Sequence, residues 1–71
     1  MEERELSRAI NGFLSTLDAE NRTLFVRRYW YLDSVADIAK RFALTESKVK
    51  TTLFRCRNQL RQYLEKGGYT L

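Results

Sequence analysis

The 71-residue sequence contains no proline and no histidine, one cysteine and three glycines. So few helix-breaking residues disfavour a turn-rich β fold and favour a compact helical domain. A single cysteine excludes an intramolecular disulfide bond. Without histidine or paired cysteines the chain has no spaced set of metal ligands, and it has no glycine-rich phosphate-binding loop. We therefore expect no enzyme activity, no cofactor and no metal.

Long apolar runs are also missing. No stretch approaches the roughly 18 apolar residues of a membrane-spanning helix, and no apolar signal-peptide core is present. A cytoplasmic protein is therefore the expectation. The sequence is 44% apolar and includes four Phe, four Tyr and one Trp. This content is enough for one small core, so we expect a single domain over residues 1–71.

Charge is divided unevenly along the chain. Residues 1–37 hold five arginines and seven acidic residues, a net charge of −2, whereas residues 38–71 hold eight basic and two acidic residues, a net charge of +6. A basic half of this kind indicates a polyanion partner, most simply nucleic acid. The alternative is a charge excess that only keeps the protein soluble.

Apolar residues recur at helical spacing in four segments, which predicts an all-α, compact four-helix domain. We expect helices over about residues 3–16, 18–31, 34–42 and 45–66. Asp18, Ser34 and Thr45 are suitable N-caps for the last three helices. Gly67 and Gly68 end the last helix, and the tail at 69–71 is expected to be loosely docked.

The aromatic residues and one glycine carry further expectations about packing. We expect Trp30, Tyr31 and Leu32 to close the second helix as a buried aromatic plug. The inner stripe of that helix is expected to include Leu24, Phe25, Arg28 and Tyr29. Phe42 is expected to face inward from the third helix. Gly12 weakens the first helix but permits close approach of a neighbouring helix.

The third and fourth predicted helices are separated by a short turn at Ala43-Leu44. Ala39 supplies a small residue where the two helices cross, and Ile38, Leu44 and Val49 supply apolar residues between them. This arrangement predicts a helix-turn-helix with a long C-terminal recognition helix.

With those residues inward, the exposed side of residues 45–57 carries side chains that reach base edges and phosphates in a major groove. Arg41, at the end of the preceding helix, is placed to reach the other phosphate wall. Cys56 falls on the apolar stripe, so we expect a small buried residue and not a nucleophile. The candidate DNA-binding residues are Thr45, Ser47, Lys48, Lys50, Thr51, Thr52, Arg55 and Arg41.

The segments RTLFVRRYWY and SVADIAKRFALTESKVKTTLFRCRNQL resemble region four of bacterial RNA polymerase sigma factors, particularly the extracytoplasmic-function class. The family pattern is an R-x-x-F-x-x-R-Y helix followed by a helix-turn-helix ending in a run like V-K-S-x-L-x-R-A-R-x-x-L. The resemblance covers about residues 13–64. The matching residues are Arg22, Phe25, Arg28, Tyr29, Ser34, Asp37, Ile38, Ala39, Leu44, Thr45, Val49, Lys50, Thr51, Leu53, Arg55, Cys56, Arg57 and Leu60.

This resemblance implies a function and partners. In the family, the last helix of region four enters the major groove of the minus-thirty-five promoter element and directs RNA polymerase to promoters. Another surface grips the flap of the polymerase β subunit, and anti-sigma factors often mask the domain. Lys48, Lys50, Thr51, Thr52 and Arg55 fall at DNA-facing positions by resemblance. No flap-contact residue follows from the motif.

Two departures from the family pattern concern the connections between helices. Ala43 stands where the family usually has a turn glycine, and Leu32-Asp33 replaces a frequent Gly-Leu pair. If Ala43 must adopt a positive φ, its side chain costs roughly 1 kcal/mol. Asp33 is an additional candidate cap.

Two alternative functions remain at this stage. The chain could be another kind of helix-turn-helix regulator, dimeric through Tyr63 and Leu64, or a protein-interaction module with an incidental basic face. An exposed apolar patch is a further possibility, although burial in the core is the simpler interpretation for each of its candidates: Ile10, Phe13, Leu17 and Trp30.

Overall fold

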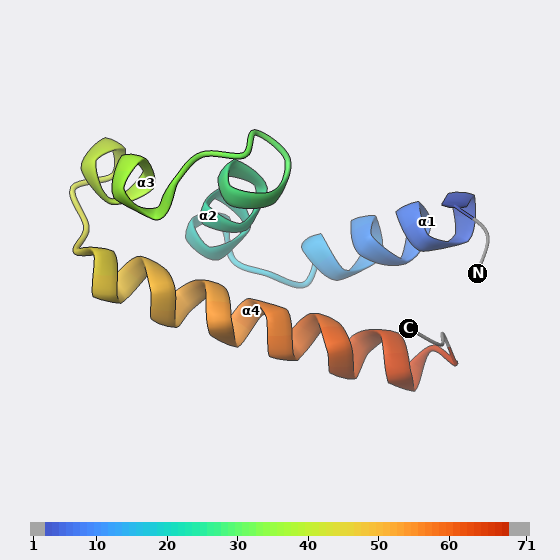
Figure 1. The fold of residues 1–71 in the computed structure, drawn as a ribbon. Coiled ribbons are helices and arrows are strands. Elements are labelled where there is room, and N and C mark those ends of the chain that lie inside the picture. Colours follow the sequence, from blue (N-terminus) through green and yellow to red (C-terminus); the bar gives the residue numbers. More distant parts are fainter. Residues whose placement is uncertain (1–2, 69–71) are drawn as a thin grey trace.

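A computed structural model describes residues 3–68, which form four helices and no strand. The helices are α1 (Glu3–Leu14), α2 (Ala19–Tyr29), α3 (Val35–Arg41) and α4 (Glu46–Lys66). The first three lie along one side of α4, which runs the length of the molecule (Figure 1). The predicted all-α four-helix architecture is confirmed, while the expectation for residues 69–71 falls outside the described residues.

The helix starts follow the predicted capping chemistry. The side-chain oxygens of Asp18, Ser34 and Thr45 accept hydrogen bonds from the backbone N–H three residues on, at 2.8, 3.0 and 3.0 Å. Each bond satisfies a backbone donor that the first helical turn leaves unpaired. At the other end, α4 stops before Gly67, and Gly68 has a φ of 80°.

The core consists of two clusters joined by α2 and α4. Leu24 on α2 packs in the cluster that joins α3 to α4, and the adjacent Phe25 packs in the cluster that joins α1 to α4. The first cluster comprises Leu24, Ile38, Ala39, Val49 and Leu53, with Val35 and Leu44 at its edge. The second comprises Phe13, Leu17, Phe25 and Cys56, with Leu14 and Leu60 at its edge.

Helix α1 approaches the C-terminal half of α4 closely. The rings of Phe13 and Tyr63 lie 5.8 Å apart. A Cβ atom added at Gly12 would lie 2.6 Å from the Tyr63 hydroxyl oxygen, well inside van der Waals contact. The absence of a side chain at Gly12 therefore permits this approach, as the sequence predicted.

The predicted aromatic plug is wrong. Helix α2 ends at Tyr29, two residues before the predicted end, and the chain then turns at Leu32, which has a left-handed φ of 59°. The turn directs the segment away from the core. Trp30, Tyr31 and Leu32 are consequently 62%, 62% and 77% exposed.

Other expectations about burial have mixed outcomes. Of the candidates for an exposed apolar patch, Phe13 and Leu17 are buried, Ile10 is half-buried and Trp30 is exposed. Phe42 and Tyr29, both predicted to face inward, are partly exposed. Among residues 3–68, no helix has the length and apolar character needed to cross a membrane.

Candidate nucleic-acid interface

Helices α3 and α4 pack on each other through the residues that the sequence predicted. Ile38 and Val49 are fully buried, and Ala39 is 6% exposed where the helices cross. The Leu44 backbone N–H donates to the Ala39 carbonyl at 2.8 Å, which closes the turn. This pair has the arrangement of a helix-turn-helix.

The turn requires a left-handed backbone at Ala43. Its φ is 55°, in a region that L-residues with a Cβ visit infrequently and that glycine adopts without steric cost. The structure thus confirms that the position needs a positive φ, and alanine there is strained by roughly 1 kcal/mol relative to glycine.

The side of α4 opposite the core is free along the helix (Figure 1). At about 100° per residue, Ser47, Thr51 and Phe54 fall within an arc of about 60° at the centre of this side. Ser47 and Thr51 are exposed, and Phe54 is 58% exposed. A stripe of two hydroxyls and one aromatic ring therefore lies where a helix in a major groove would meet base edges.

The sequence analysis did not identify Phe54, although a signal was available. Phe54 directly follows Leu53, which is on the buried stripe, so helical geometry rotates it by about 100° away from the core. An aromatic residue that is 58% exposed gains little stability from the fold, and its exposure suggests a contact with another molecule.

Basic side chains border the central stripe on both edges. Lys50 is exposed on one edge, and Lys48 and Arg55 are exposed on the other. Lys48 and Arg55 line a hollow of about 280 Å³ together with Asp18 and Glu20 from the start of α2. The positive potential on this second edge is therefore partly offset by two carboxylates.

Thr52 does not belong to the exposed face, contrary to the prediction. It is 6% exposed and lines the floor of the same hollow with Cys56. The reason is helical periodicity, because Thr52 comes three residues after Val49 and four before Cys56, both of which are buried. We remove it from the candidate interface.

The remaining predicted residues lie near the start of α4. Arg41 is exposed at the end of α3, and Thr45 is exposed at the N-cap of α4. The Thr45 hydroxyl accepts from the Lys48 backbone N–H, so its own hydrogen remains able to donate. A helix N-terminus with such donors suits a phosphate group.

Cys56 is buried, as expected from its place on the apolar stripe. Burial, and to a smaller extent the negative charge of Asp18, raises the pKa of its thiol. The protonated thiol is a poor nucleophile, so Cys56 serves as a packing residue.

Helix α2, which precedes the helix-turn-helix, contacts α1, α4 and the loop before α3. The Phe25 ring packs on Phe13 and Tyr29, with ring centroids 6.0 and 4.8 Å away. Arg57 on α4 donates to the Tyr29 hydroxyl at 2.6 Å. Arg28 donates to the Asp33 carbonyl at 3.1 Å. The R-x-x-F-x-x-R-Y pattern thus supplies contacts that position α2 against α4 and against the loop before α3.

The family comparison agrees with this geometry. A family model described as "Sigma-70, region 4" matches residues 5–60, which is most of the chain. The chain belongs to the sigma-70 region 4 family. The match runs from α1 through most of α4 and includes the whole helix-turn-helix. No curated protein sequence matches the chain significantly.

Membership in the family establishes the general role. Region 4 domains are DNA-binding parts of sigma factors and act on promoters together with RNA polymerase. The match is to region 4 as a whole, and the likeness to the extracytoplasmic-function class stays a prediction.

Proposed function

We propose that this region 4 domain reads the minus-thirty-five promoter element through the outward side of α4 and thereby directs RNA polymerase to promoters. The observation that supports this most is the stripe of Ser47, Thr51 and Phe54 between basic edges. Its centre carries groups that distinguish bases, and its edges carry groups that bind phosphates. We treat residues 1–71 as one such domain.

Each part of the interface has a defined task in this proposal. Ser47 and Thr51 donate or accept hydrogen bonds at base edges, and Phe54 makes an apolar contact with a thymine methyl group. Lys50 on one edge and Lys48 and Arg55 on the other bind phosphates and fix the position of α4 in the groove. Arg41 and the N-terminus of α4, with Thr45, bind further phosphates.

The polymerase is the second partner in the proposal, with the β flap as its contact by family resemblance. An anti-sigma factor that masks the domain is a third. Within the transcription machinery the domain acts in the cytoplasm. The part it plays is recognition, and the catalytic chemistry belongs to the polymerase.

A dimeric regulator is the competing interpretation, but the residues predicted to join two copies are used within the domain. Leu64 is 2% exposed, and the Tyr63 ring packs against Phe13. Leu64 is therefore unavailable as a dimer seam, and Tyr63, which is 36% exposed, already takes part in the contact between α1 and α4.

Random-sequence selection with the full chain, followed by anisotropy titrations of the selected duplex, tests the proposal. Four exposed basic residues at the interface (Arg41, Lys48, Lys50 and Arg55) predict a slope of log K against log[salt] of about −3.6, from about 0.9 per phosphate. Lys50→Ala should weaken binding to all duplexes alike, whereas Phe54→Ala should relax the preference at one base position. A flat salt response, or no duplex binding at low salt, would contradict the proposal.

A further inference from the structure

The hollow beside the candidate DNA interface has the features of a small-molecule site. It lies between the start of α2 and the middle of α4, and we call it the polar hollow. Carboxylates of Asp18 and Glu20 line it from α2, and the basic groups of Lys48 and Arg55 line it from α4. Its volume of about 280 Å³ is close to the lower end of the roughly 300–1,000 Å³ typical of ligand pockets. An occupant would therefore be a small molecule.

The opposite charges around the polar hollow do not pair with each other. The described residues contain one ion pair, between Arg27 and Asp33, so neither carboxylate of the hollow contacts Lys48 or Arg55. Asp18 is partly used within the fold, because its carboxylate accepts from the Asn21 backbone N–H. A molecule that carries both a positive and a negative group can form charge-assisted hydrogen bonds with both sides of the hollow at once.

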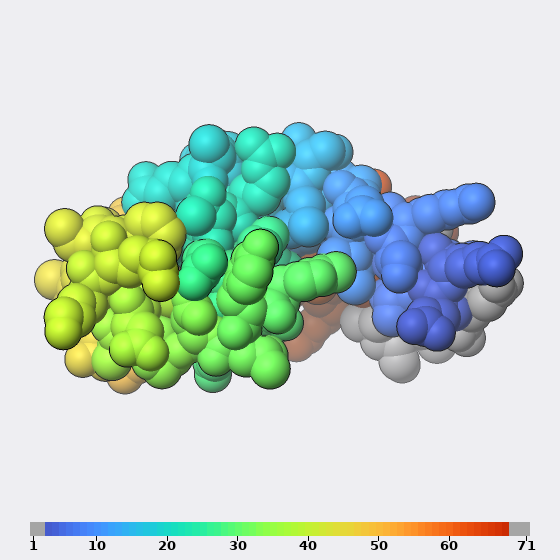
Figure 2. Space-filling model, turned by 90° about the horizontal axis from the view of Figure 1, so that it is seen from above, coloured from blue at the N-terminus to red at the C-terminus, as the bar shows by residue number. Residues whose placement is uncertain are grey.

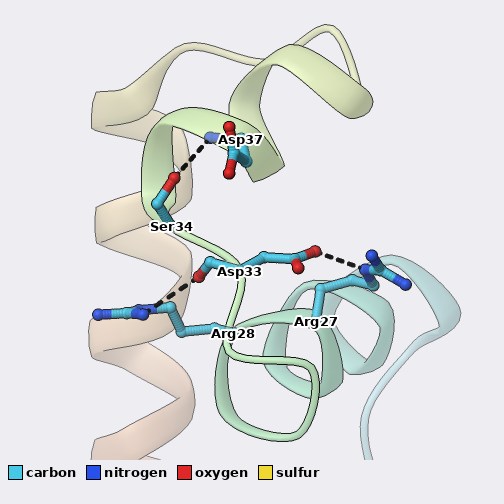
Figure 3. Close-up of polar contacts among 5 residues, drawn as sticks. All are labelled: Arg27, Arg28, Asp33, Ser34 and Asp37. Atoms are coloured by element: carbon cyan, nitrogen blue, oxygen red, sulfur yellow. Dashed lines mark hydrogen bonds and ion pairs between the residues drawn. The ribbon is translucent and has the colours of Figure 1, made fainter.

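The other end of α2 shows that unpaired charges are not a general property of this helix. Arg27 donates to the Asp33 carboxylate at 2.7 Å, and Arg28 donates to the Asp33 carbonyl at 3.1 Å, as Figure 3 shows. The connection after this helix end lies at the surface on the face away from α4, in green in Figure 2. Its carboxylate is satisfied within the domain, whereas the carboxylate of Glu20 at the start of α2 has no ion-pair partner among the described residues.

Thr52 adds an uncharged polar group to the polar hollow. It lines the hollow and is only 6% exposed. The hydroxyls of Thr16, Thr23 and Thr45 bond to the backbone, but that of Thr52 makes no hydrogen bond to another described residue. No fully buried side-chain N or O atom among those residues lacks a partner, so the Thr52 oxygen must open into the hollow. A nearly buried hydroxyl left in this way favours an occupant that bonds to it.

We propose that the polar hollow binds a free α-amino acid with a short polar side chain. A simple anion would be opposed by Asp18 and Glu20, and a simple cation by Lys48 and Arg55. The carboxylate of an amino acid instead pairs with the two basic groups, while its ammonium group pairs with Glu20. Its polar side chain bonds to the Thr52 hydroxyl and to the Gln59 amide, which also lines the hollow.

The bound amino acid also regulates DNA binding. Lys48 and Arg55 are the basic groups assigned to phosphates on this edge of α4, and an amino acid that occupies them withdraws them from the duplex. This regulatory part rests on the proposed function, whereas binding of the amino acid to the free domain does not. The domain thereby loses part of its phosphate contacts when the amino acid is abundant.

Backbone NMR of the full chain, titrated without DNA, tests the binding. The probes are L-serine, L-threonine, L-asparagine and L-glutamine. At least one should give saturable shifts at Asn21, Thr52 and Gln59, with Trp30 unchanged. A few exposed charges and hydrogen bonds should give a Kd of about 1 mM.

Derivatives of the amino acid that binds best are the matched ligand controls. Its N-acetyl derivative keeps only the negative charge, and its carboxamide keeps only the positive charge. Each should bind about fivefold more weakly or worse, because the remaining charge meets a side chain of like charge in the hollow.

Thr52→Val removes the hydroxyl and should weaken amino-acid binding about two- to tenfold, as for one hydrogen bond. Thr52→Ser keeps the hydroxyl and should bind like wild type. Because the hydroxyl has no partner in the domain, Thr52→Val should leave the melting temperature and the duplex affinity without amino acid unchanged. Glu20→Gln should weaken amino-acid binding while it strengthens duplex binding, so its two effects have opposite signs.

Anisotropy titrations with the selected duplex test the regulation. A saturating amino acid should lower duplex affinity and change the slope of log K against log[salt] from about −3.6 to about −1.8, because two fewer phosphates are bound. The same concentration should have a smaller effect on Thr52→Val.

The proposal is overturned if none of the four amino acids gives saturable shifts, or if the shifts lie outside the polar hollow. Equal binding of the N-acetyl derivative or the carboxamide would contradict recognition of both charges, and an unchanged salt slope would contradict the regulation. Failure of the proposed function gives a different result, namely a wild-type chain that binds the amino acid but no duplex.

Discussion

Ala43 and Leu32 are the two residues other than glycine with a positive φ in the described part of the chain. They sit in the two connections that flank α3. Each has a Cβ in a backbone region that favours glycine, but their surroundings differ. Ala43 closes the turn of the helix-turn-helix, whereas Leu32 projects a large apolar side chain into solvent. Strain at Ala43 belongs to the turn of the helix-turn-helix, whereas strain at Leu32 accompanies an apolar side chain that is 77% exposed.

Replacing Ala43 with glycine should stabilise the domain by up to about 1 kcal/mol, because the strain of the left-handed backbone is relieved. Ala36→Gly, at an exposed position inside α3, is the matched control and should destabilise by about 1 kcal/mol. Urea unfolding followed by circular dichroism measures both. Equal destabilisation by the two substitutions would show that Ala43 is unstrained.

Glu20 provides a test of electrostatics at the residue scale. It lines the hollow that also holds Lys48 and Arg55, so its charge opposes binding of phosphates at that edge. Glu20→Gln should raise duplex affinity about two- to fivefold at low salt, a typical size for one exposed charge interaction. Glu5→Gln on α1 is the control and should have little effect. Identical affinities for the two variants would place the duplex away from this edge.

At the scale of elements, the helix starts could be predicted because capping depends on local chemistry. Asp18, Ser34 and Thr45 each bind a backbone N–H three residues away, and that spacing is visible in the sequence. The end of α2 could not be predicted in the same way. It depends on the left-handed backbone at Leu32 and on the Arg27–Asp33 ion pair, which the apolar pattern of Trp30 and Tyr31 does not indicate.

The docking of α1 on α4 should depend on Gly12 and Tyr63 together. Gly12→Ala gains about 1 kcal/mol of helix propensity but places a methyl group against the Tyr63 hydroxyl. In a Tyr63→Phe background that oxygen is gone. The Gly12→Ala substitution should therefore be more favourable there by about 0.5 kcal/mol or more, a typical coupling free energy for residues in contact. A double-mutant cycle of unfolding free energies measures this coupling. A coupling of zero would mean that the two residues do not meet in solution.

For the molecule as a whole, the sequence predicted the fold and most of the candidate interface. The apolar spacing of four segments predicted the fold, and the charge contrast between residues 1–37 and 38–71, together with the apolar spacing of α3 and α4, predicted the candidate interface. The prediction from sequence made two errors at the interface, and both concern residues on the same turn of α4. Thr52 was placed outside and is buried, while Phe54 was overlooked and is exposed. Which flank of a helix is covered depends on the neighbouring helix, here the start of α2, and this information is absent from a local pattern.

The packing of the whole domain also controls the chemistry of Cys56. Its buried thiol has a raised pKa, so it stays protonated at neutral pH and is shielded from reagents. Labelling with a thiol reagent at pH 7 should therefore be slow in the native protein and fast in denaturant. Rapid native labelling would show that the contact between α2 and α4 opens readily.

The central claim is that the outward side of α4 binds promoter DNA, and backbone NMR of the full chain titrated with the selected duplex tests it most directly. The account predicts the largest chemical-shift changes at Ser47, Lys50, Thr51 and Phe54, with Trp30 and α1 nearly unchanged. Changes centred on Trp30, Tyr31 and Leu32, with α4 unaffected, would contradict it.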